Sequence, residues 1–230
     1  MGSKSPLQIQ AYDYLKDMIL NGKLEPDVLY SETRMATEIG ISRTPMREAL
    51  QCLSQSGYIT IVPSKGFMLR KLNEKDMLET IQIRCAIEGF CVRMAAAEIE
   101  TKKGQKLLAE LERLLERQEK VIQSKKGPSA ENIRNDCCSK AGMNQFMEYD
   151  HKFHLALIHY AENEEFLHTF QRLMYLIRLT TVSALSVPGR TEETLKEHRL
   201  IFEHLKDGDG DGVYKLVTMH LMTPLMLHLT

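Results

Sequence analysis

Residues 31–58 constrain the fold of this chain more than any other stretch, because they predict two short amphipathic helices joined by a tight turn. The apolar residues of the first helix share one face, and Gly40 marks its C-terminal end. Ser42 precedes the second helix as an N-cap, and the apolar residues of that helix follow the spacing of one buried face. These residues are Met46, Ala49, Leu50 and Leu53.

Polar residues gather on the first turn and outer face of the second helix, at Arg43, Thr44 and Arg47. A helix that enters the major groove of DNA contacts bases with these positions. Arg can bond bidentately to guanine there, and the free amides of a helix N-terminus can bind phosphate. Arg on the outer face of a single helix is equally typical of a solvated surface, so the prediction of a DNA-binding helix-turn-helix depends on the whole segment.

β-forming residues follow at 58–62 and 67–70, around a turn at 63–66 that ends in glycine, and this pattern predicts a β-hairpin. The whole run resembles the winged-helix domain of the GntR family of bacterial transcription regulators. The hallmark of that family is a core like SRTPxREAL followed by LxxxGxI, which residues 42–50 and 53–59 match. The resemblance implies that the chain binds operator DNA and that the hairpin is a wing whose tip approaches the minor groove. The contact residues that it implies are Arg34, Ser42, Arg43, Thr44, Arg47, Lys65 and Gly66.

The net charge of −1 is unusual for a DNA-binding protein, but the charge is unevenly distributed. Residues 1–72 hold 9 Lys and Arg against 7 Asp and Glu, a net charge of +2, whereas the remaining 158 residues hold 21 against 24, a net charge of −3. Because +2 is modest, we expect DNA affinity to depend on a few placed arginines and on the pairing of two subunits, with a moderate dependence on salt.

At 230 residues and 43% hydrophobic composition, the chain is long enough for two domains with separate cores. We predict a winged helix-turn-helix DNA-binding domain at 1–72 and an all-α domain at 73–230, which makes the fold mainly α with a small β-hairpin. The odd number of cysteines, five, indicates a reducing compartment. There is no apolar run of about 18 residues and no apolar signal core, so we expect a cytoplasmic protein without a membrane partner.

Helical periodicity continues through the C-terminal part of the chain. Residues 125–144 interrupt it with a polar stretch that contains Gly127 and Pro128, and this predicts a mobile loop with at most a short helix. Cys137 and Cys138 lie in this loop, and the sequence assigns them no role. The helices expected outside the helix-turn-helix are 9–21, 73–99, 102–124, 146–162, 164–185, 192–207 and 211–230.

One predicted helix carries Asp150 and His154 four residues apart, so both side chains point the same way beside an apolar line. His198 and His220 begin and end the apolar faces of two further helices. If these faces converge inside a bundle, three neutral imidazoles and one carboxylate meet. That ligand set suits a borderline divalent ion and leaves coordination positions open. A lone histidine on an apolar face is more often a core residue, and periodicity alone does not establish convergence.

The helical part resembles the FCD ligand-sensing domain of FadR-type GntR regulators. The metal-binding branch of that domain carries Asp-x-x-x-His, then Glu-His-x-x-Ile/Leu, then a His in the last helix. Residues 150–154, residues 197–201 and His220 match this pattern. The resemblance implies an antiparallel all-α bundle, a homodimer and a metal ion, with zinc as the first candidate and nickel or manganese as alternatives. The ligands that it implies are Asp150, His154, His198 and His220.

Two other features offer competing ligand assignments. His151 is the strongest rival ligand, because it lies three residues before His154 and an error in the helix rotation would exchange its role with that of Asp150. Residues 207–212 copy the first half of an EF-hand calcium loop, but Thr218 stands at the twelfth position, where calcium needs a bidentate Glu. An acidic turn with an Asp as N-cap explains that segment better.

A small carboxylate can complete the coordination of such an ion while a nearby guanidinium neutralises its charge. Arg84 lies in a stretch that resembles the R-x-x-x-E of the first FCD helix, whose Arg lines the effector pocket; a plain i,i+4 pair with Glu88 is the alternative. Arg178 is the second effector-binding candidate. Pro224 removes the amide that would bond to the carbonyl of His220, so we expect the last helix to bend or to end near the metal.

Together these features predict a homodimeric transcription regulator, responsive to a metal and a small carboxylate, that binds a palindromic operator and is not an enzyme. Two alternatives stay open. Open-site zinc can activate water, which would make the chain a metal-dependent hydrolase, although no Glu or His is obviously placed as a base beside the four ligands. The metal could also be purely structural and hold the bundle together.

Overall fold

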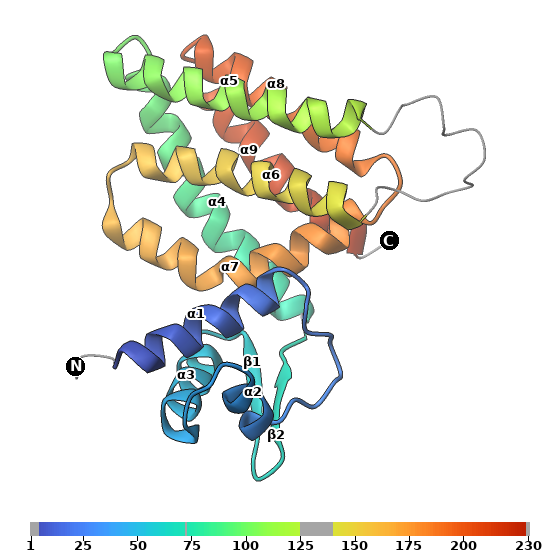
Figure 1. The fold of residues 1–230 in the computed structure, drawn as a ribbon. Coiled ribbons are helices and arrows are strands. Elements are labelled where there is room, and N and C mark those ends of the chain that lie inside the picture. Colours follow the sequence, from blue (N-terminus) through green and yellow to red (C-terminus); the bar gives the residue numbers. More distant parts are fainter. Residues whose placement is uncertain (1–4, 72, 125–139, 229–230) are drawn as a thin grey trace. The chain divides into compact units, whose positions relative to one another are not determined.

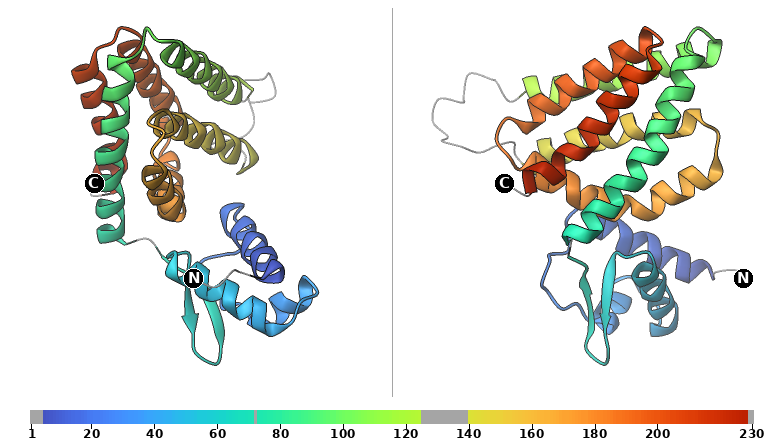
Figure 2. Two further views of the ribbon diagram at one scale, coloured as in Figure 1. Left: turned by 90° about the vertical axis from the view of Figure 1, so that its left-hand side faces the viewer. Right: turned by 180° about the vertical axis from the view of Figure 1, so that it is seen from behind.

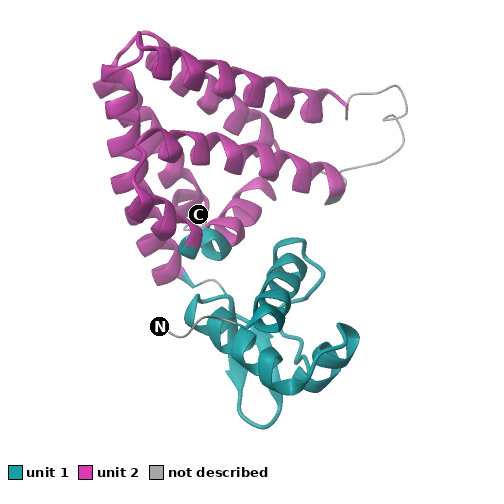
Figure 3. Cartoon of the chain, turned by 60° about the vertical axis from the view of Figure 1, so that its left-hand side comes forward, with its two compact units in different colours: residues 1–73, 172–176 teal, residues 74–171, 177–230 magenta. Residues whose placement is uncertain are grey.

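The computed structural model describes residues 5–71, 73–124 and 140–228, and this part of the chain is mainly α with one two-stranded sheet. Figure 1 shows the order of its elements. Two compact units, distinguished in Figure 3, divide the chain into residues 1–73 with 172–176 and residues 74–171 with 177–230. The division after Asn73 lies next to the boundary expected from the sequence, whereas the inclusion of 172–176 in the first unit was not expected.

The first unit contains the helix-turn-helix, and its helices are α1 (Pro6–Leu20), α2 (Glu32–Glu38) and α3 (Arg43–Gln55). Helix α1 begins three residues before the predicted start because Ser5 caps it. The Ser5 hydroxyl accepts a hydrogen bond from the Gln8 amide at 3.2 Å, and Pro6 occupies the first helical position. Gly40 has a φ of 70°, a left-handed conformation that follows the end of α2, as predicted.

The wing is a hairpin of β1 (Ile59–Val62) and β2 (Gly66–Leu69), paired antiparallel with Val62 opposite Gly66. Tyr30 extends the sheet by one bridge, because its amide donates to the Phe67 carbonyl at 2.8 Å and its carbonyl accepts from the Phe67 amide at 3.0 Å. Gly66 has a φ of 137°, and a Cβ on it would collide with the Tyr30 carbonyl. This close approach of two backbones requires glycine at position 66.

The second unit is entirely helical in the described residues. Figure 2 shows α4 and α9 lying side by side, while α5 packs against both α6 and α8. Its helices are α4 (Glu74–Ala97), α5 (Lys102–Gln123), α6 (Lys140–Tyr160), α7 (Glu164–Leu185), α8 (Arg190–Lys206) and α9 (Gly210–His228).

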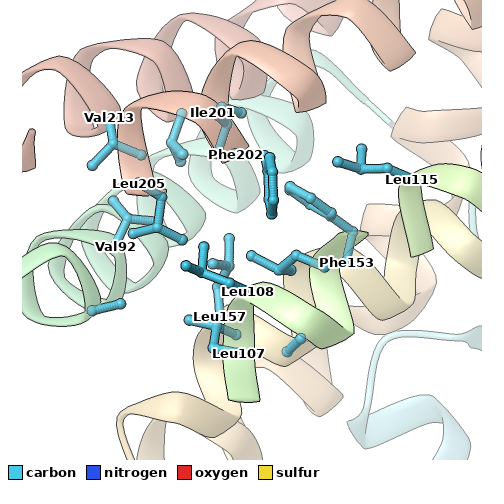
Figure 4. Packing of buried hydrophobic residues seen from close by; sticks show 14 of the residues in the cluster. Val92, Leu107, Leu108, Leu115, Phe153, Leu157, Ile201, Phe202, Leu205 and Val213 are labelled. Atoms are coloured by element: carbon cyan, nitrogen blue, oxygen red, sulfur yellow. The ribbon is translucent and has the colours of Figure 1, made fainter. Parts of the chain in front are cut away.

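An apolar core joins all six of these helices, and α7 contributes Leu185 at its C-terminal end. Figure 4 shows Phe153 of α6, Phe202 of α8 and Leu115 of α5 meeting in it. Leu157 of α6 and Val213 of α9 are fully buried in the same cluster. Because α6, α8 and α9 also carry the predicted metal ligands, the packing of this core fixes the backbone positions from which those ligands project.

The start of α6 differs from the prediction. The helix begins at Lys140 instead of near residue 146, while residues 125–139, with Cys137 and Cys138, lie outside the described part. Met143 packs against the core three residues before the buried Phe146, so the apolar face extends further back than the polar composition indicated. Gly142 and Asn144, both poor helix formers, concealed this extension.

The last two helices also depart from expectation at their ends. Helix α8 begins at Arg190, directly after Gly189 with a φ of 80°, so Arg190 lies in the first turn rather than in a loop. Helix α9 continues past Pro224 to His228, so the proline does not end it. Between them, the Asp209 carboxylate accepts a hydrogen bond from the Gly212 amide at 2.9 Å, which confirms the acidic N-cap.

Candidate metal centre and DNA-binding surface

The four predicted metal ligands meet in the interior of the second unit. Asp150 and His154 come from α6, His198 from α8 and His220 from α9. None of the four residues is more than 8% exposed. One ligand atom from each lies within 4.8 Å of the other three, and the imidazole Nε2 atom of His220 is 3.2 Å from that of His154 and 3.3 Å from that of His198.

Four of the separations between ligand atoms are short enough for a single ion. Two ligand atoms bound to one ion at about 2.1 Å each lie at most about 4.2 Å apart. Besides the two imidazole pairs, an Asp150 oxygen lies 3.6 Å from Nε2 of His198 and 4.0 Å from Nε2 of His154. The donor set also fits, because three imidazole nitrogens and one carboxylate oxygen suit borderline divalent ions. The cluster can therefore hold a metal ion.

Hydrogen-bond acceptors at three other helix positions orient the imidazoles. The Nδ1 atoms of His154, His198 and His220 lie 2.6 Å from a Glu88 oxygen, 2.9 Å from the Gln118 amide oxygen and 2.6 Å from a Glu197 oxygen. Because these partners are acceptors, each Nδ1 carries the proton and each Nε2 presents a lone pair. Three nitrogen lone pairs and a carboxylate thus face one another with no hydrogen-bond donor among them. A cation bound between them would interact favourably with all four groups.

Burial sets the protonation of the ligands. It lowers the pKa of both His154 and His198 well below the usual range, so these imidazoles are neutral, as metal ligands must be. Burial also raises the pKa of Asp150, whose ionised form consequently needs a positive charge close by. Glu197 differs: burial alone would raise its pKa, but hydrogen bonds from His220 and Arg190 lower it to about 2.

His151, the rival ligand, lies outside the cluster. Its ring stacks on Phe170 with centroids 5.5 Å apart and an interplanar angle of 8°. Burial lowers the pKa of His151 to about 4, and its Nδ1 atom has no hydrogen-bond partner among the described residues. Asp150 rather than His151 therefore faces His198 and His220, which confirms the predicted rotation of the helix.

Arg84 reaches the same place from α4. Its Nε atom donates to Glu88 at 2.7 Å, so the predicted i,i+4 pair exists, and both side chains are buried. Arg84 also lines a cavity of about 30 Å³ beside the cluster, together with Asp150, His154 and His220. Glu88 thus connects Arg84 to His154. The i,i+4 salt bridge with Glu88 and the position of Arg84 beside the metal ligands, which were alternatives in the sequence, are both present in the structure.

Arg190 is a buried cationic group that the sequence did not reveal. It lines the cavity, and its two Nη atoms each donate to one Glu197 oxygen at 2.6 Å. Glu197 in turn holds His220, so Arg190 and Glu197 together fix the third imidazole. The predicted helix began at residue 192, so Arg190 fell outside it. The spacing of seven residues to Glu197 matches two helical turns, a signal that could have paired them.

Arg178, the second effector candidate, does not line this cavity. Its guanidinium contacts the Asn144 side chain at 3.3 Å, and burial lowers its pKa. Thr181, one turn further along α7, lines the cavity instead.

The predicted DNA contacts lie on the first unit. Arg34, Ser42 and Thr44 are exposed around α2 and the start of α3. A groove of about 590 Å³ runs between α3 and the wing and brings four of the predicted residues together. These four are Arg43, Arg47, Lys65 and Gly66.

Glu32 lies in the same groove and was not expected to belong to this surface. One of its oxygens is 3.2 Å from an Nη atom of Arg47 and 3.6 Å from Nε of Arg43. The two arginine side chains are 57% and 62% exposed, whereas that of Glu32 is 19% exposed. Glu32 therefore ties two long exposed side chains to the start of α2. Its place directly after the N-cap Ser31 was the available signal.

A helix-turn-helix with a hairpin wing, joined to a helical bundle that carries a buried ligand cluster, defines a DNA-binding transcription regulator. Residues 7–81 match the model of bacterial regulatory proteins of the gntR family, and residues 79–223 match that of the FCD domain. The chain belongs to the GntR family and carries an FCD domain.

Relatives span almost the whole chain. The HTH-type transcriptional regulator YdhC of Bacillus subtilis is 30% identical over 216 residues, which cover 94% of this chain and 88% of YdhC. The HTH-type transcriptional repressor RspR of Escherichia coli is 27% identical over 94% of this chain and 86% of RspR. These relatives are regulators rather than enzymes, which removes the hydrolase alternative.

Solved structures share the fold. McbR/YncC of E. coli has a TM-score of 0.72 at 22% identity and covers 100% of both chains. A GntR regulator from Rhodococcus sp. RHA1 has a TM-score of 0.76 at 18% identity, with 98% of both chains covered. At such identities the likeness concerns the fold alone.

Two remaining expectations concern the whole chain. No helix in the described residues is both long and apolar enough to span a bilayer. Cys52, Cys85 and Cys91 are free thiols, and burial raises the pKa of Cys91 to about 12, as expected of a small core residue.

Proposed function

We propose that this regulator is a homodimeric metal-dependent sensor that binds a palindromic operator and responds to a small carboxylate. Residues 1–72 contact DNA, and residues 73–230 bind the metal and effector and form the dimer. The observation that carries the proposal is the buried cluster of three histidines and one aspartate beside Arg84. RspR is named a repressor, and we extend that role to this chain, acting on DNA in the cytoplasm.

The proposed metal is zinc, with nickel and manganese as alternatives, held by Asp150, His154, His198 and His220. A bound divalent ion would act as a Lewis acid and coordinate a carboxylate oxygen. The protein supplies the rest: Glu88, Gln118 and Glu197 hold the imidazoles in place, and Arg84 offers a guanidinium to the carboxylate. Of the two effector candidates Arg84 is favoured over Arg178, because only Arg84 lines the cavity.

On the DNA side, Arg43 and Arg47 enter the major groove while Lys65 and Gly66 of the wing approach the minor groove. Arg34, Ser42 and Thr44 add contacts to phosphates and base edges. Two copies of the chain place two such surfaces on the halves of a palindrome. Effector binding changes the spacing of the two recognition helices, so operator affinity and effector affinity are linked reciprocally.

The proposal is tested on purified dimer loaded with zinc. Elemental analysis gives the metal content, and operator binding is measured with and without a series of small carboxylates. We expect one metal per chain, and an operator affinity that shifts by a factor of about 5–150 for an acid that binds. If every acid that demonstrably binds leaves operator affinity unchanged, the chain is not a carboxylate sensor.

A structural metal is the competing explanation, and chelation separates the two. A metal that only holds the bundle together should unfold the second unit when a chelator removes it, because binding free energy is then folding free energy. A sensor metal should leave a largely helical protein, since the apolar core of the second unit does not include the ligands. Circular dichroism of the chelated protein distinguishes these outcomes.

A further inference from the structure

Three residues other than glycine have a positive φ in the described part of the chain, a conformation that is unfavourable for an L residue with a side chain. They are Asp27, Ser64 and Glu162, with φ values of 65°, 60° and 50°. The carboxylate of Asp27 pairs with Lys71 Nζ at 2.7 Å, and that of Glu162 pairs with Lys103 Nζ at 3.2 Å. The hydroxyl of Ser64 has no hydrogen-bond partner among the described residues. Ser64 is therefore the one of the three whose strain is not accompanied by a side-chain contact within this part of the protein.

Ser64 occupies the third position of the turn at the tip of the wing. The Lys65 amide donates to the Val62 carbonyl at 3.0 Å, which closes a four-residue turn from Val62 to Lys65. Pro63 at the second position and a positive φ at the third are the features of a type II turn. Glycine or asparagine is the usual residue at the third position, because both tolerate a positive φ. Serine is thus a less favourable residue for this turn than either.

The surroundings of Ser64 do not explain the presence of serine through packing. Ser64 is exposed, and it lines the groove of about 590 Å³ between α3 and the wing, together with Arg47 and Lys65. Strained backbone positions cluster at sites of function, where a partner makes use of the strained geometry. A hydroxyl group is present here although glycine would form the turn more easily, and this indicates that the hydroxyl has a partner outside the protein.

DNA is the partner that the position of the groove favours. Under the proposed function, on which this inference rests, α3 enters the major groove and the wing approaches the minor groove. One sugar-phosphate strand separates these two grooves of B-DNA, so that strand has to pass between α3 and the wing. The groove that Ser64 lines is in this place. Serine hydroxyl groups are among the usual donors to phosphate oxygens.

The cationic side chains of the groove do not make a neutral donor redundant. Arg43 and Arg47 both pair with the Glu32 carboxylate, at 3.6 and 3.2 Å. Part of their positive charge is therefore balanced within the protein, and Lys65 is the third cationic side chain in the lining. A hydrogen bond from a neutral hydroxyl consequently contributes more to holding phosphate here than it would on a strongly basic surface.

We propose that Ser64 positions the wing on DNA, because its hydroxyl donates a hydrogen bond to a phosphate oxygen of the strand between α3 and the wing. The turn is less stable with serine than it would be with glycine, and the contact with DNA is what serine adds. Substitutions at position 64 should therefore affect stability and DNA affinity in opposite directions.

The first test is Ser64→Ala in the full chain, which removes the hydroxyl but keeps a restricted backbone. Fluorescence anisotropy measures binding to the operator and to unrelated DNA. We expect both affinities to fall about fivefold to tenfold, since a hydrogen bond to a charged group is lost. The two losses should be equal because a phosphate contact carries no sequence information. The slope of affinity against salt should not change, because a neutral hydroxyl releases no counterion.

The second test separates the hydroxyl from the turn with Ser64→Gly and Ser64→Asn. Both new side chains suit a positive φ, so neither variant should lower the melting temperature of the first unit, and asparagine should raise it by a few degrees. The glycine variant has no donor and should bind DNA as weakly as Ser64→Ala. The asparagine variant offers an amide donor, and its affinity should stay within about threefold of that of the unsubstituted protein.

Ser54→Ala is the matched control, because Ser54 lies on α3 but does not line the groove, and its affinity should change by less than about twofold. Unchanged affinity of Ser64→Ala, or a loss confined to the operator, overturns the assignment of the hydroxyl to phosphate. A loss in Ser64→Gly alone also overturns it, since stiffness of the turn would then be the cause. Lys65→Ala identifies failure of the proposed DNA docking: if this variant also binds DNA normally, the wing does not contact DNA at all.

Discussion

The two units use ionisable side chains in opposite ways. In the first unit Arg43 and Arg47 are more than half exposed and converge on a single carboxylate, that of Glu32. In the second unit the four ligands are almost completely buried, and each imidazole has a dedicated acceptor behind it. The charges of a DNA-binding surface can be solvated by water until DNA binds. A buried site, in contrast, must provide a partner within the protein for each polar group.

The largest expected effect is on metal content, and it tests whether the two units are functionally separate. The double substitution His154→Ala and His220→Ala removes two of four ligands from α6 and α9. We expect metal retention, measured by elemental analysis, to fall to background, while DNA binding by the first unit persists in the absence of effector. Unchanged metal content would mean that other residues hold the ion. Alanine at His151, which lies outside the cluster, is the control and should retain metal.

Core truncation should affect stability in one unit only. Leu157 is fully buried in the core of the second unit, and Leu157→Ala should lower its free energy of unfolding by about 2–5 kcal/mol. Leu53→Ala is the matched truncation in the first unit, where Leu53 is equally buried on α3. Calorimetry of both variants should show a different transition lowered in each. A single transition that falls equally in both variants would show that the units unfold together.

Removing one recognition arginine should weaken DNA binding without changing the metal site. Arg47→Ala is expected to cost about 1–3 kcal/mol in operator affinity and to reduce discrimination between operator and unrelated DNA. Fluorescence anisotropy at fixed salt measures both quantities, and elemental analysis should give unchanged metal content. Lys65→Ala is the comparison, because a lysine on phosphate should lower affinity for all sequences about equally and reduce the salt slope by about one.

The sequence predicted the structure best where the spacing of residues within a single helix was sufficient. The faces of α3 and α6 follow from spacing alone, and the i,i+4 relation of Asp150 and His154 placed both at one site. Convergence with His198 and His220 needed the family resemblance, because packing of distant helices is not encoded in local periodicity. The same limit explains why Glu88, 66 residues before His154, was expected only as a partner of Arg84 and not as an acceptor for the imidazole.

Errors occurred where weak helix formers or glycine concealed a boundary. Gly142 and Asn144 hid the first turns of α6, and the predicted start of α8 at residue 192 left Arg190 outside the helix. That second error mattered more, because Arg190 holds Glu197 and thereby the His220 ring. Gly66 shows the reverse case: its expected place at the wing tip has a backbone reason, the contact with Tyr30, that no sequence pattern indicated.

The smallest expected effect concerns Glu32, and it most directly sharpens the contrast between an open charged surface and a sealed one. Glu32→Gln keeps the size of the side chain but removes the negative charge that holds Arg43 and Arg47. Specific operator affinity should fall a few-fold, because two long side chains lose their shared anchor. Affinity for unrelated DNA should rise a few-fold, because one repulsive charge facing phosphate is lost. Anisotropy titrations over a salt series measure both.

Glu38→Gln is the control for this pair of opposite effects, because Glu38 is exposed at the other end of α2 and does not line the groove. If Glu32 only stabilised the fold, its substitution would lower both affinities together along with the melting temperature. If it were merely a repulsive charge, both affinities would rise. Only a residue that positions the arginines separates specific from non-specific binding, so opposite signs in the two titrations assign Glu32 to DNA recognition.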